Sequence, residues 1–333
     1  MRSTSLIRQP GGLAVPAATP RSRSSASILV TRGALPLLIA AVIVFAWVTT
    51  PAFMTADNGS AILMNASVVG ILAVSMTPIT LSGNFVSLAA QQQTVLAAVI
   101  FLGLLASGHP AWLAIILVLL VSILVGTLQG IIVAAGLNPV VTSLATGSVL
   151  VGVMTLGTEG RLVTAPGADI SWIVGRGLLG VPAPVYLFVS LTLILMFVVD
   201  RTTGGRRIML VGSNKATASI SGISHQSIAV WVFIAFSIGA AFAGFVLAAQ
   251  LGQITPYDSA NLSIDVIAAV LVGGVSIRGG EGSPLNSAVG AVLIAVFNNV
   301  MVLQGLAEGW RMTIVGTAVI LMVCLLHILR RRI

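Results

Sequence analysis

The stretch WLAIILVLLVSILVGTLQGIIVAA, Trp112–Ala135, contains no charged side chain over 24 residues. At a rise of about 1.5 Å per residue, a helix of this length crosses a hydrocarbon core about 30 Å thick. Lipid offers no partner for backbone N–H and C=O groups, so only helices and closed barrels span membranes. The strands of a barrel are much shorter than this run and alternate in polarity. The stretch therefore predicts a transmembrane α-helix.

Composition extends this prediction to the whole chain. Of the 333 residues, 57% are hydrophobic and 7% are charged, whereas soluble domains carry about 25% charged residues. Further apolar runs lie at approximately residues 34–53, 60–81, 86–106, 140–156, 184–199, 228–249, 264–275, 285–303 and 312–329. We therefore predict an all-α, polytopic membrane protein with about ten transmembrane helices. The run at 264–275 is too short to cross fully, so we expect a broken or re-entrant segment there, near the pathway.

The distribution of charge predicts the domain organisation and the orientation. Residues 1–33 are rich in Arg, Ser and Pro without any acid, which is typical of a disordered cytosolic tail. A secretory signal is the alternative, but the apolar run that follows is long enough to span and lacks a clear cleavage site. Residues 34–329 are predicted to form a single transmembrane domain, and residues 330–333 a basic cytosolic end.

The net charge of +8 comes from basic residues that lie between and outside the apolar runs. This location favours an orientation signal over a nucleic-acid surface. Ten crossings place both termini on the same side as the basic loop at 200–227. By the positive-inside rule that side is the cytosol.

Ionisable residues are nearly absent from the predicted helices. Asp57, Asp258 and Asp265 lie at predicted helix ends, whereas ion-coupled transporters carry such groups inside the bundle. The chain has no GxxxxGK[ST] loop, so any nucleotide must be hydrolysed by a partner. The single cysteine, Cys324, and the scattered histidines form no metal-ligand or triad pattern. We expect a chain that is not an enzyme and binds no cofactor, with ATP and Mg²⁺ held by a partner ATPase.

The loop segment VGSNKATASISGI, Val211–Ile223, carries a short helix-compatible piece between two glycines that allow sharp turns. It resembles the G-x-N-x-x-A-a-x-x-S-G-I segment of permeases in ABC importers of the ribose, xylose and autoinducer-2 type. The resemblance implies a cytosolic coupling helix held by the ATPase. From spacing alone, an ordinary amphipathic connector remains open. The residues carried over are Gly212, Asn214, Ala216, Ala218, Ser221, Gly222 and Ile223.

Two further segments are similar to signatures of the same family: IDVIAAVLVGGVSIRGGEG, Ile264–Gly282, and VFNNVMVLQGL, Val296–Leu306. A third, SGNFVSLAAQQQ, Ser82–Gln93, departs from the family because Val86 replaces an expected aspartate. Its glutamines either bond to neighbouring helices or line the pore. The residues that we assign to the translocation pathway are Asn84, Phe85, Ser87, Gln91, Asp265, Gly273, Gly274, Ser276, Gly279, Gly280, Gly282, Asn298 and Asn299.

The resemblance implies the permease subunit of a binding-protein-dependent ABC importer for a small polar solute, a monosaccharide or related polyol. Its expected partners are a cytosolic ABC ATPase, an extracytoplasmic solute-binding protein, membrane lipid and a second permease copy in a homodimer or heterodimer, without nucleic acid. A branched-chain amino-acid permease of related fold is the nearest alternative. A stand-alone secondary transporter is disfavoured by the missing intramembrane charges.

Overall fold

The computed structural model describes residues 44, 46–48, 50–177, 180–317 and 320, and every structural statement below concerns these residues. The predicted basic tail at 1–33 and the basic end at 330–333 lie outside them. Most of the predicted apolar runs at 34–53 and 312–329 also lie outside, except for the 3-10 helix η2 (Pro51–Met54) and a helical segment at 308–317.

Six described helices are long and apolar enough to cross a membrane. They are α3 (Ala56–Leu81), α5 (Ala111–Ala134), α6 (Pro139–Thr158), α8 (Ala183–Arg201), α11 (His225–Leu251) and α13 (Pro284–Leu303). Each coincides with a predicted apolar run. Two shorter apolar helices, α4 (Ala90–Ala106) and α12 (Leu262–Val272), occupy two more of the predicted runs. The structure is therefore mostly helical, as expected.

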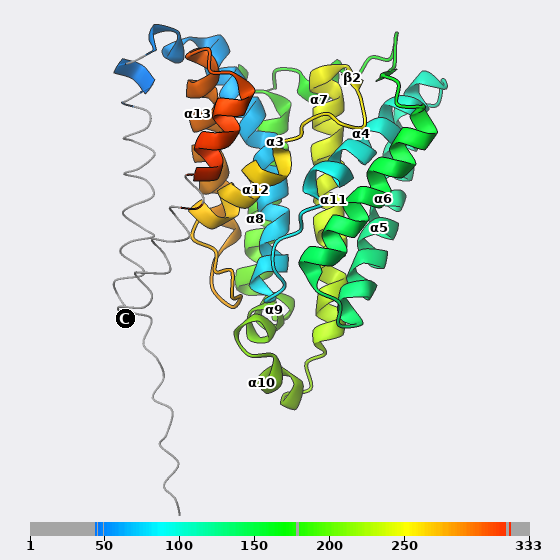
Figure 1. Ribbon diagram of the computed structural model, residues 1–333, viewed down its shortest axis with the longest axis vertical. Helices are drawn as coiled ribbons and strands as arrows, with labels where there is room; N and C mark the ends of the chain where they lie inside the picture. Colours follow the sequence, from blue (N-terminus) through cyan, green and yellow to red (C-terminus); the bar gives the residue numbers. More distant parts are fainter. Residues whose placement is uncertain (1–43, 45, 49, 178–179, 318–319, 321–333) are drawn as a thin grey trace, which may run out of the picture.

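The remaining described elements lie at the two ends of the molecule (Figure 1). One end carries α9 (Thr203–Ser213) and α10 (Lys215–Ile220), and we call it the α10 end. The opposite end carries α7 (Ser171–Val174) and the strands β1 (Val163–Thr164) and β2 (Gln253–Ile254). The strands pair antiparallel, with Val163 opposite Ile254. The apolar runs predicted neither this small sheet nor α9.

The central helices are α3 and α11, and most of their residues are buried. Helix α5 packs closely on α11 because two of its contact residues are glycines. A Cβ atom on Gly126 would lie 2.8 Å from the Phe233 carbonyl oxygen, and one on Gly130 would lie 2.7 Å from Val230 Cα. Small residues allow such close approach where apolar burial cannot drive helix association.

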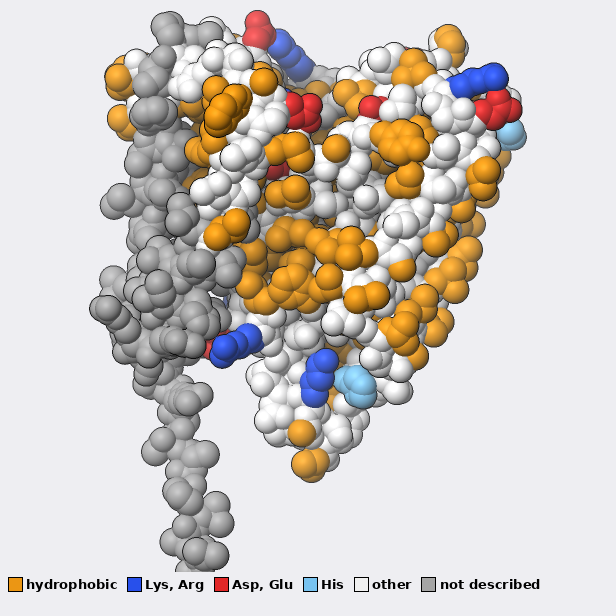
Figure 2. Space-filling view, in the orientation of Figure 1, with side chains coloured by type: hydrophobic (Ala, Val, Ile, Leu, Met, Phe, Trp, Pro, Cys, Tyr) orange, Lys and Arg blue, Asp and Glu red, His pale blue; other side chains and the backbone are white. Residues whose placement is uncertain are grey.

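The outer surface has the pattern expected of a protein in lipid. Helices α5, α6 and α8 leave large apolar side chains exposed, among them Leu120, Leu156 and Phe197. Figure 2 shows hydrophobic side chains across the middle of the visible face and charged ones near its two ends. Since lipid solvates apolar side chains, this exposed belt needs no protein cover.

Two interruptions of regular structure lie inside the bundle. Helix α4 starts at Ala90, whereas the predicted run begins at residue 86, because residues 82–89 form a turn and a non-helical segment. Helix α12 contains 11 residues and is therefore about 16 Å long, roughly half of a hydrocarbon core. It ends at Gly273, and Gly274 has a φ of 80°. The expected break at these two glycines is present.

Candidate functional site

A pocket of about 440 Å³ lies between α3, α11, α12, α13 and the helical residues 308–315. It uses the first half of α3, up to Val69, and the last part of α13. Since the last turn of α3 lies beside α9, the pocket is in the half of the bundle remote from the α10 end. Its polar lining is Asn58, Asn65, Gln250, Ser259, Asn261, Asp265, Asn298, Asn299, Glu308 and Arg311.

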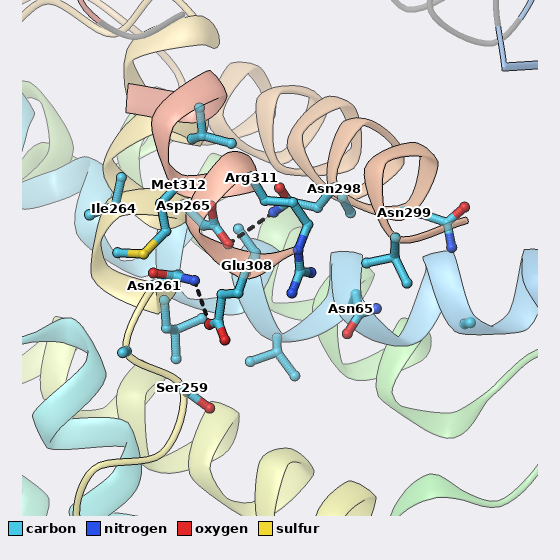
Figure 3. A pocket seen from close by; sticks show the side chains of 18 of the residues that line it. Asn65, Ser259, Asn261, Ile264, Asp265, Asn298, Asn299, Glu308, Arg311 and Met312 are labelled. Atoms are coloured by element: carbon cyan, nitrogen blue, oxygen red, sulfur yellow. Dashed lines mark hydrogen bonds between the residues drawn. The ribbon is translucent and has the colours of Figure 1, made fainter. Parts of the chain in front are cut away.

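Two hydrogen bonds organise the carboxylates of the pocket (Figure 3). Asn298 Nδ2 donates to Asp265 Oδ2 at 2.9 Å, and Asn261 Nδ2 donates to Glu308 Oε1 at 2.8 Å. Arg311 lies among these residues. Its Nε and the Oδ1 atom of Asn261 are buried and have no hydrogen-bond partner in the described part of the chain. Arg311 and Asn261 thus each keep one buried polar atom without a partner beside the pocket.

A second pair of amides in the pocket lining is bonded reciprocally. Asn58 Nδ2 donates to Asn299 Oδ1 at 3.1 Å, and Asn299 Nδ2 donates back to Asn58 Oδ1 at 2.7 Å. Asn58 also donates to the Phe53 carbonyl oxygen at 2.9 Å. Both N–H groups of the Asn58 amide are therefore used within the protein. This pair holds the start of α3 against the end of α13.

The N-termini of α4 and α12 meet next to the pocket. The Gln91 N–H donates to Ser263 Oγ at 3.0 Å, and the same hydroxyl donates to the Leu88 carbonyl oxygen at 3.2 Å. Gln91 Nε2 donates to the Asp258 carbonyl oxygen at 3.1 Å. Helix N-termini carry N–H groups without intrahelical partners. The Ser263 hydroxyl accepts a hydrogen bond from one such group and joins the two shorter helices inside the bundle.

The glutamines at the start of α4 face different neighbours. Gln93 Nε2 donates to Gln129 Oε1 on α5 at 2.8 Å, and Gln93 Oε1 accepts from Ser237 Oγ on α11 at 2.9 Å. Gln92 packs beside Gly147 on α6. These contacts favour the role of interhelical bonding for Gln93. None of these glutamines lines the pocket.

Of the residues assigned to the pathway, the pocket brings together Asp265, Asn298 and Asn299. Asn84, Phe85 and Ser87 lie in the non-helical segment before α4. There Asn84 Nδ2 donates to Ser82 Oγ at 3.0 Å, and Phe85 remains 37% exposed. Among the assigned residues of the segment after α12, Gly279 and Gly280 lie against the end of α9, whereas Gly273 packs against Asn286 on α13. None of the assigned residues in this segment lines the pocket: Gly273, Gly274, Ser276, Gly279, Gly280 and Gly282.

The segment assigned to ATPase coupling forms α10, and its motif residues are the folding signals of that helix. The Asn214 side chain accepts hydrogen bonds from the N–H groups of Ala216 and Thr217, at 3.0 and 3.1 Å. At the other end, the Ile223 N–H donates to the Ala218 carbonyl oxygen at 2.9 Å, and the Gly222 N–H donates to that of Ser219 at 3.0 Å.

These two closing bonds form a Schellman cap, which requires a left-handed residue at the position of Gly222. The φ of Gly222 is 74°. Ala218 is buried under the cap, whereas Ala216 and Ser221 are exposed. Gly212 belongs to the end of α9, where it packs against the last turn of α3. The motif thus specifies a short, well-capped helix at one end of the bundle.

Several pocket residues were not predicted from the sequence. Asn261, Glu308 and Arg311 carry no motif, and charged residues beside an apolar run are ordinarily interfacial. Only the packing of residues 308–315 against α12 and α13 reveals their position in the pocket. Across the described residues, no group of three or more His, Cys, Asp or Glu side chains is arranged to hold a metal ion.

A bundle of apolar helices with two shorter members and a polar pocket fits a membrane transport protein. Residues 58–325 match the family described as "Branched-chain amino acid transport system / permease component", and the chain belongs to this family. The predicted kinship with ribose- and xylose-type permeases is confirmed. The chain is thus a permease component of a transport system and not an enzyme.

The chain is similar over most of its length to bacterial sugar permeases. It is 31% identical over 295 residues to the ribose import permease protein RbsC of Haemophilus influenzae, which covers 86% of this chain and 90% of the relative. RbsC of Bacillus subtilis is 29% identical over 281 residues, covering 84% and 87%. The xylose transport system permease protein XylH of Escherichia coli is 28% identical over 358 residues, covering 89% and 91%. No solved structure gives a significant match.

Proposed function

We propose that this chain forms the translocation pathway of a binding-protein-dependent ABC importer for a neutral polyhydroxylated solute, a monosaccharide or related polyol. The pocket between α3, α12 and α13 is the observation that carries the proposal. The names of the ribose and xylose permeases among its relatives support the solute class.

The charges in the pocket disfavour an anionic solute and suit a neutral one that can bond to both signs of charge. Its lining holds two carboxylates, Asp265 and Glu308, and one guanidinium, Arg311. A sugar hydroxyl both donates and accepts, so it can bond to either kind of group. An anionic solute faces two like charges and only one opposite charge, which raises the cost of its binding. A neutral polyol meets no such penalty.

In the proposed importer, the α10 end is cytosolic and α10 contacts the ABC ATPase. The exposed basic side chains Arg206, Arg207 and Lys215 lie at this end, consistent with the positive-inside rule. Ile220, on α10, is 88% exposed and is available for an apolar contact with a partner. With ten crossings, both termini lie on this side of the bacterial inner membrane.

The pocket then faces the extracytoplasmic side, where a solute-binding protein delivers the solute. A second permease copy, identical or homologous, completes the pathway. Nucleotide binding to the ATPase shifts the population between outward- and inward-open states, and it can do so only by binding the two states with different affinity.

The test is uptake by proteoliposomes that contain the full-length chain, its ATPase and its solute-binding protein. We expect ATP-dependent accumulation of a neutral polyol from a panel of radiolabelled D-ribose, D-xylose and ribitol, and none of L-leucine. Accumulation of L-leucine alone would establish the amino-acid alternative. Accumulation driven by an ion gradient, by the isolated chain without nucleotide, would refute the proposal.

A further inference from the structure

Three segments that are distant in the sequence meet backbone to backbone between α10 and the pocket. They are the end of α3 and its following turn at residues 81–83, the end of α9 at 212–213, and the turn at 278–280 that follows α12. The Gly280 N–H donates to the Leu81 carbonyl oxygen at 2.9 Å. Figure 1 shows the loop after α12 descending toward α9. We call this contact the glycine junction.

No side chain separates the backbones at the glycine junction. A Cβ atom on Gly212 would overlap the Leu81 carbonyl oxygen and would lie 2.7 Å from the Gly280 nitrogen. A Cβ on Gly279 would lie 2.7 Å from Gly83 Cα and 3.0 Å from Gly212 Cα. Distances below 3.0 Å force the backbone to move, because the opposing atoms are main chain and have no rotamer to change.

The backbone conformation adds a second constraint. The φ angles of Gly83, Gly279 and Gly280 are 75°, 85° and 76°. Residues with a Cβ pay a steric penalty of about 1 kcal/mol or more in this region. The glycine junction therefore has little room to deform, and its three segments are expected to move together.

The glycine junction connects the segment assigned to ATPase coupling with the segments assigned to the translocation pathway. On one side, α9 leads directly into α10 through Asn214. On the other, α12 runs from Asp265 in the pocket to the break at Gly273 and Gly274. The distance along α3 from the pocket residue Val69 to Leu81 is roughly 18 Å at 1.5 Å per residue.

Resting on the proposed function, we propose that Gly83, Gly212 and Gly279 are positioning residues that transmit movement of α10 to α12 and hence to the pocket. In this role the three glycines neither contact the ATPase nor touch the solute. Their packing makes α9, the end of α3 and the start of the loop after α12 one rigid unit, so that a tilt of α10 displaces Asp265. A side chain at the junction loosens this unit and uncouples ATP hydrolysis from transport.

The first experiment compares two glycines of the same helix in the reconstituted importer. Gly212→Ala intrudes on the junction, whereas Gly204→Ala is the matched control, because the nearest atom to its Cβ is Thr202 Oγ1 at 3.5 Å. We expect Gly212→Ala to lower the solute transported per ATP hydrolysed by roughly tenfold, and Gly204→Ala to keep it within about twofold, in the range of coupling energies.

Labelling of the pocket distinguishes a loss of coupling from a merely structural defect. Ile264 lines the pocket and is 41% exposed. It is replaced by cysteine in a chain that carries Cys324→Ser, so that the new cysteine is the only one. In the assembled importer with an intact junction, reaction with a thiol reagent should change when a non-hydrolysable ATP analogue is added. In the Gly212→Ala importer that still assembles and binds the analogue, this change should disappear.

A third measurement needs no substitution of the glycines. Spin labels at Ser213→Cys and Arg278→Cys, exposed positions on two of the segments that form the junction, should keep one distance with and without nucleotide. A distance that changes, or a Gly212→Ala importer with the wild-type coupling ratio, overturns the inference. If the wild-type and Gly204→Ala importers show no ATP-dependent uptake, the proposed function fails instead.

Discussion

Asn214 and Gly222 show how single residues define the candidate coupling helix. Helix α10 contains six residues, and isolated helices of this length are unstable in water. Asn214 supplies an acceptor to two free N–H groups at its start, and Gly222 adopts the left-handed conformation that closes its end. The cap residues therefore contribute a large share of the stability of this element.

Replacement of Asn214 by alanine should weaken α10. The loss of the two cap hydrogen bonds costs about 1 kcal/mol, so hydrogen exchange at residues 215–220 should become faster and ATPase binding weaker. Asn214→Asp should restore both, because its carboxylate accepts the same bonds. Ser219→Ala, at an exposed position of the same helix, is the control. Unchanged exchange in Asn214→Ala would contradict the capping role.

Replacement of Arg311 by methionine should weaken solute binding. A hydrogen bond to a charged group contributes about 1.5–3 kcal/mol, so the solute concentration for half-maximal uptake should rise roughly 10- to 100-fold. Arg311→Gln should lose less, because its amide still donates. The measurement is the concentration dependence of polyol uptake by the reconstituted importer. Equal values for the wild type and Arg311→Met would remove Arg311 from the solute site.

At the scale of elements, the two shorter helices α4 and α12 shape the interior of the bundle. Each starts within the protein, and the two N-termini share the Ser263 hydroxyl. Non-helical backbone inside a membrane is tolerated only where protein or water satisfies its polar groups. The hydrogen bonds of residues 88–91 and 258–263 meet this requirement beside the pocket.

Removal of the Ser263 hydroxyl should therefore lower stability. Ser263→Ala leaves the Gln91 N–H and the Leu88 carbonyl group without their partner, at a cost of about 1–3 kcal/mol. The melting temperature of the purified protein in detergent should fall. Ser148→Ala is the control, because the exposed Ser148 hydroxyl bonds only within its own helix, to the Leu144 carbonyl oxygen. A melting temperature equal to that of the control would count against a structural role for this joint.

At the scale of the whole molecule, the two ends have different chemistry. The α10 end carries α9 and α10 with their basic side chains. The other end carries the short β-sheet and α7, and the pocket lies in that half of the bundle. The glycine junction lies between α10 and the pocket, as the proposed coupling requires.

The orientation of the two ends can be tested by labelling in intact cells. After Cys324→Ser, cysteines are placed at Ser219 on α10 and, in a second variant, at Arg161 in the loop after α6; both positions are exposed. A thiol reagent that does not cross the inner membrane should label Arg161→Cys and should label Ser219→Cys only after lysis. Labelling of Ser219→Cys in intact cells would reverse the proposed topology.

Much of the secondary structure could be predicted, because its causes are local. A helix in lipid satisfies its own backbone polar groups, so an uncharged run such as Trp112–Ala135 predicts α5 without reference to other segments. The short helix α10 was predictable for the same reason, since its cap residues Asn214 and Gly222 act within a few residues of their own position. Helix α9 was missed because two glycines in its first turn obscure its pattern.

The pocket and the glycine junction depend on contacts between residues far apart in the chain. Asn58 and Asn299 are 241 positions apart and bond to each other. Gly83, Gly212 and Gly279 carry separate motifs and meet only when three helices have packed. The polarity pattern determines which segments enter the membrane. Packing alone determines which polar groups face one another, because it depends on the shapes of all neighbouring helices together.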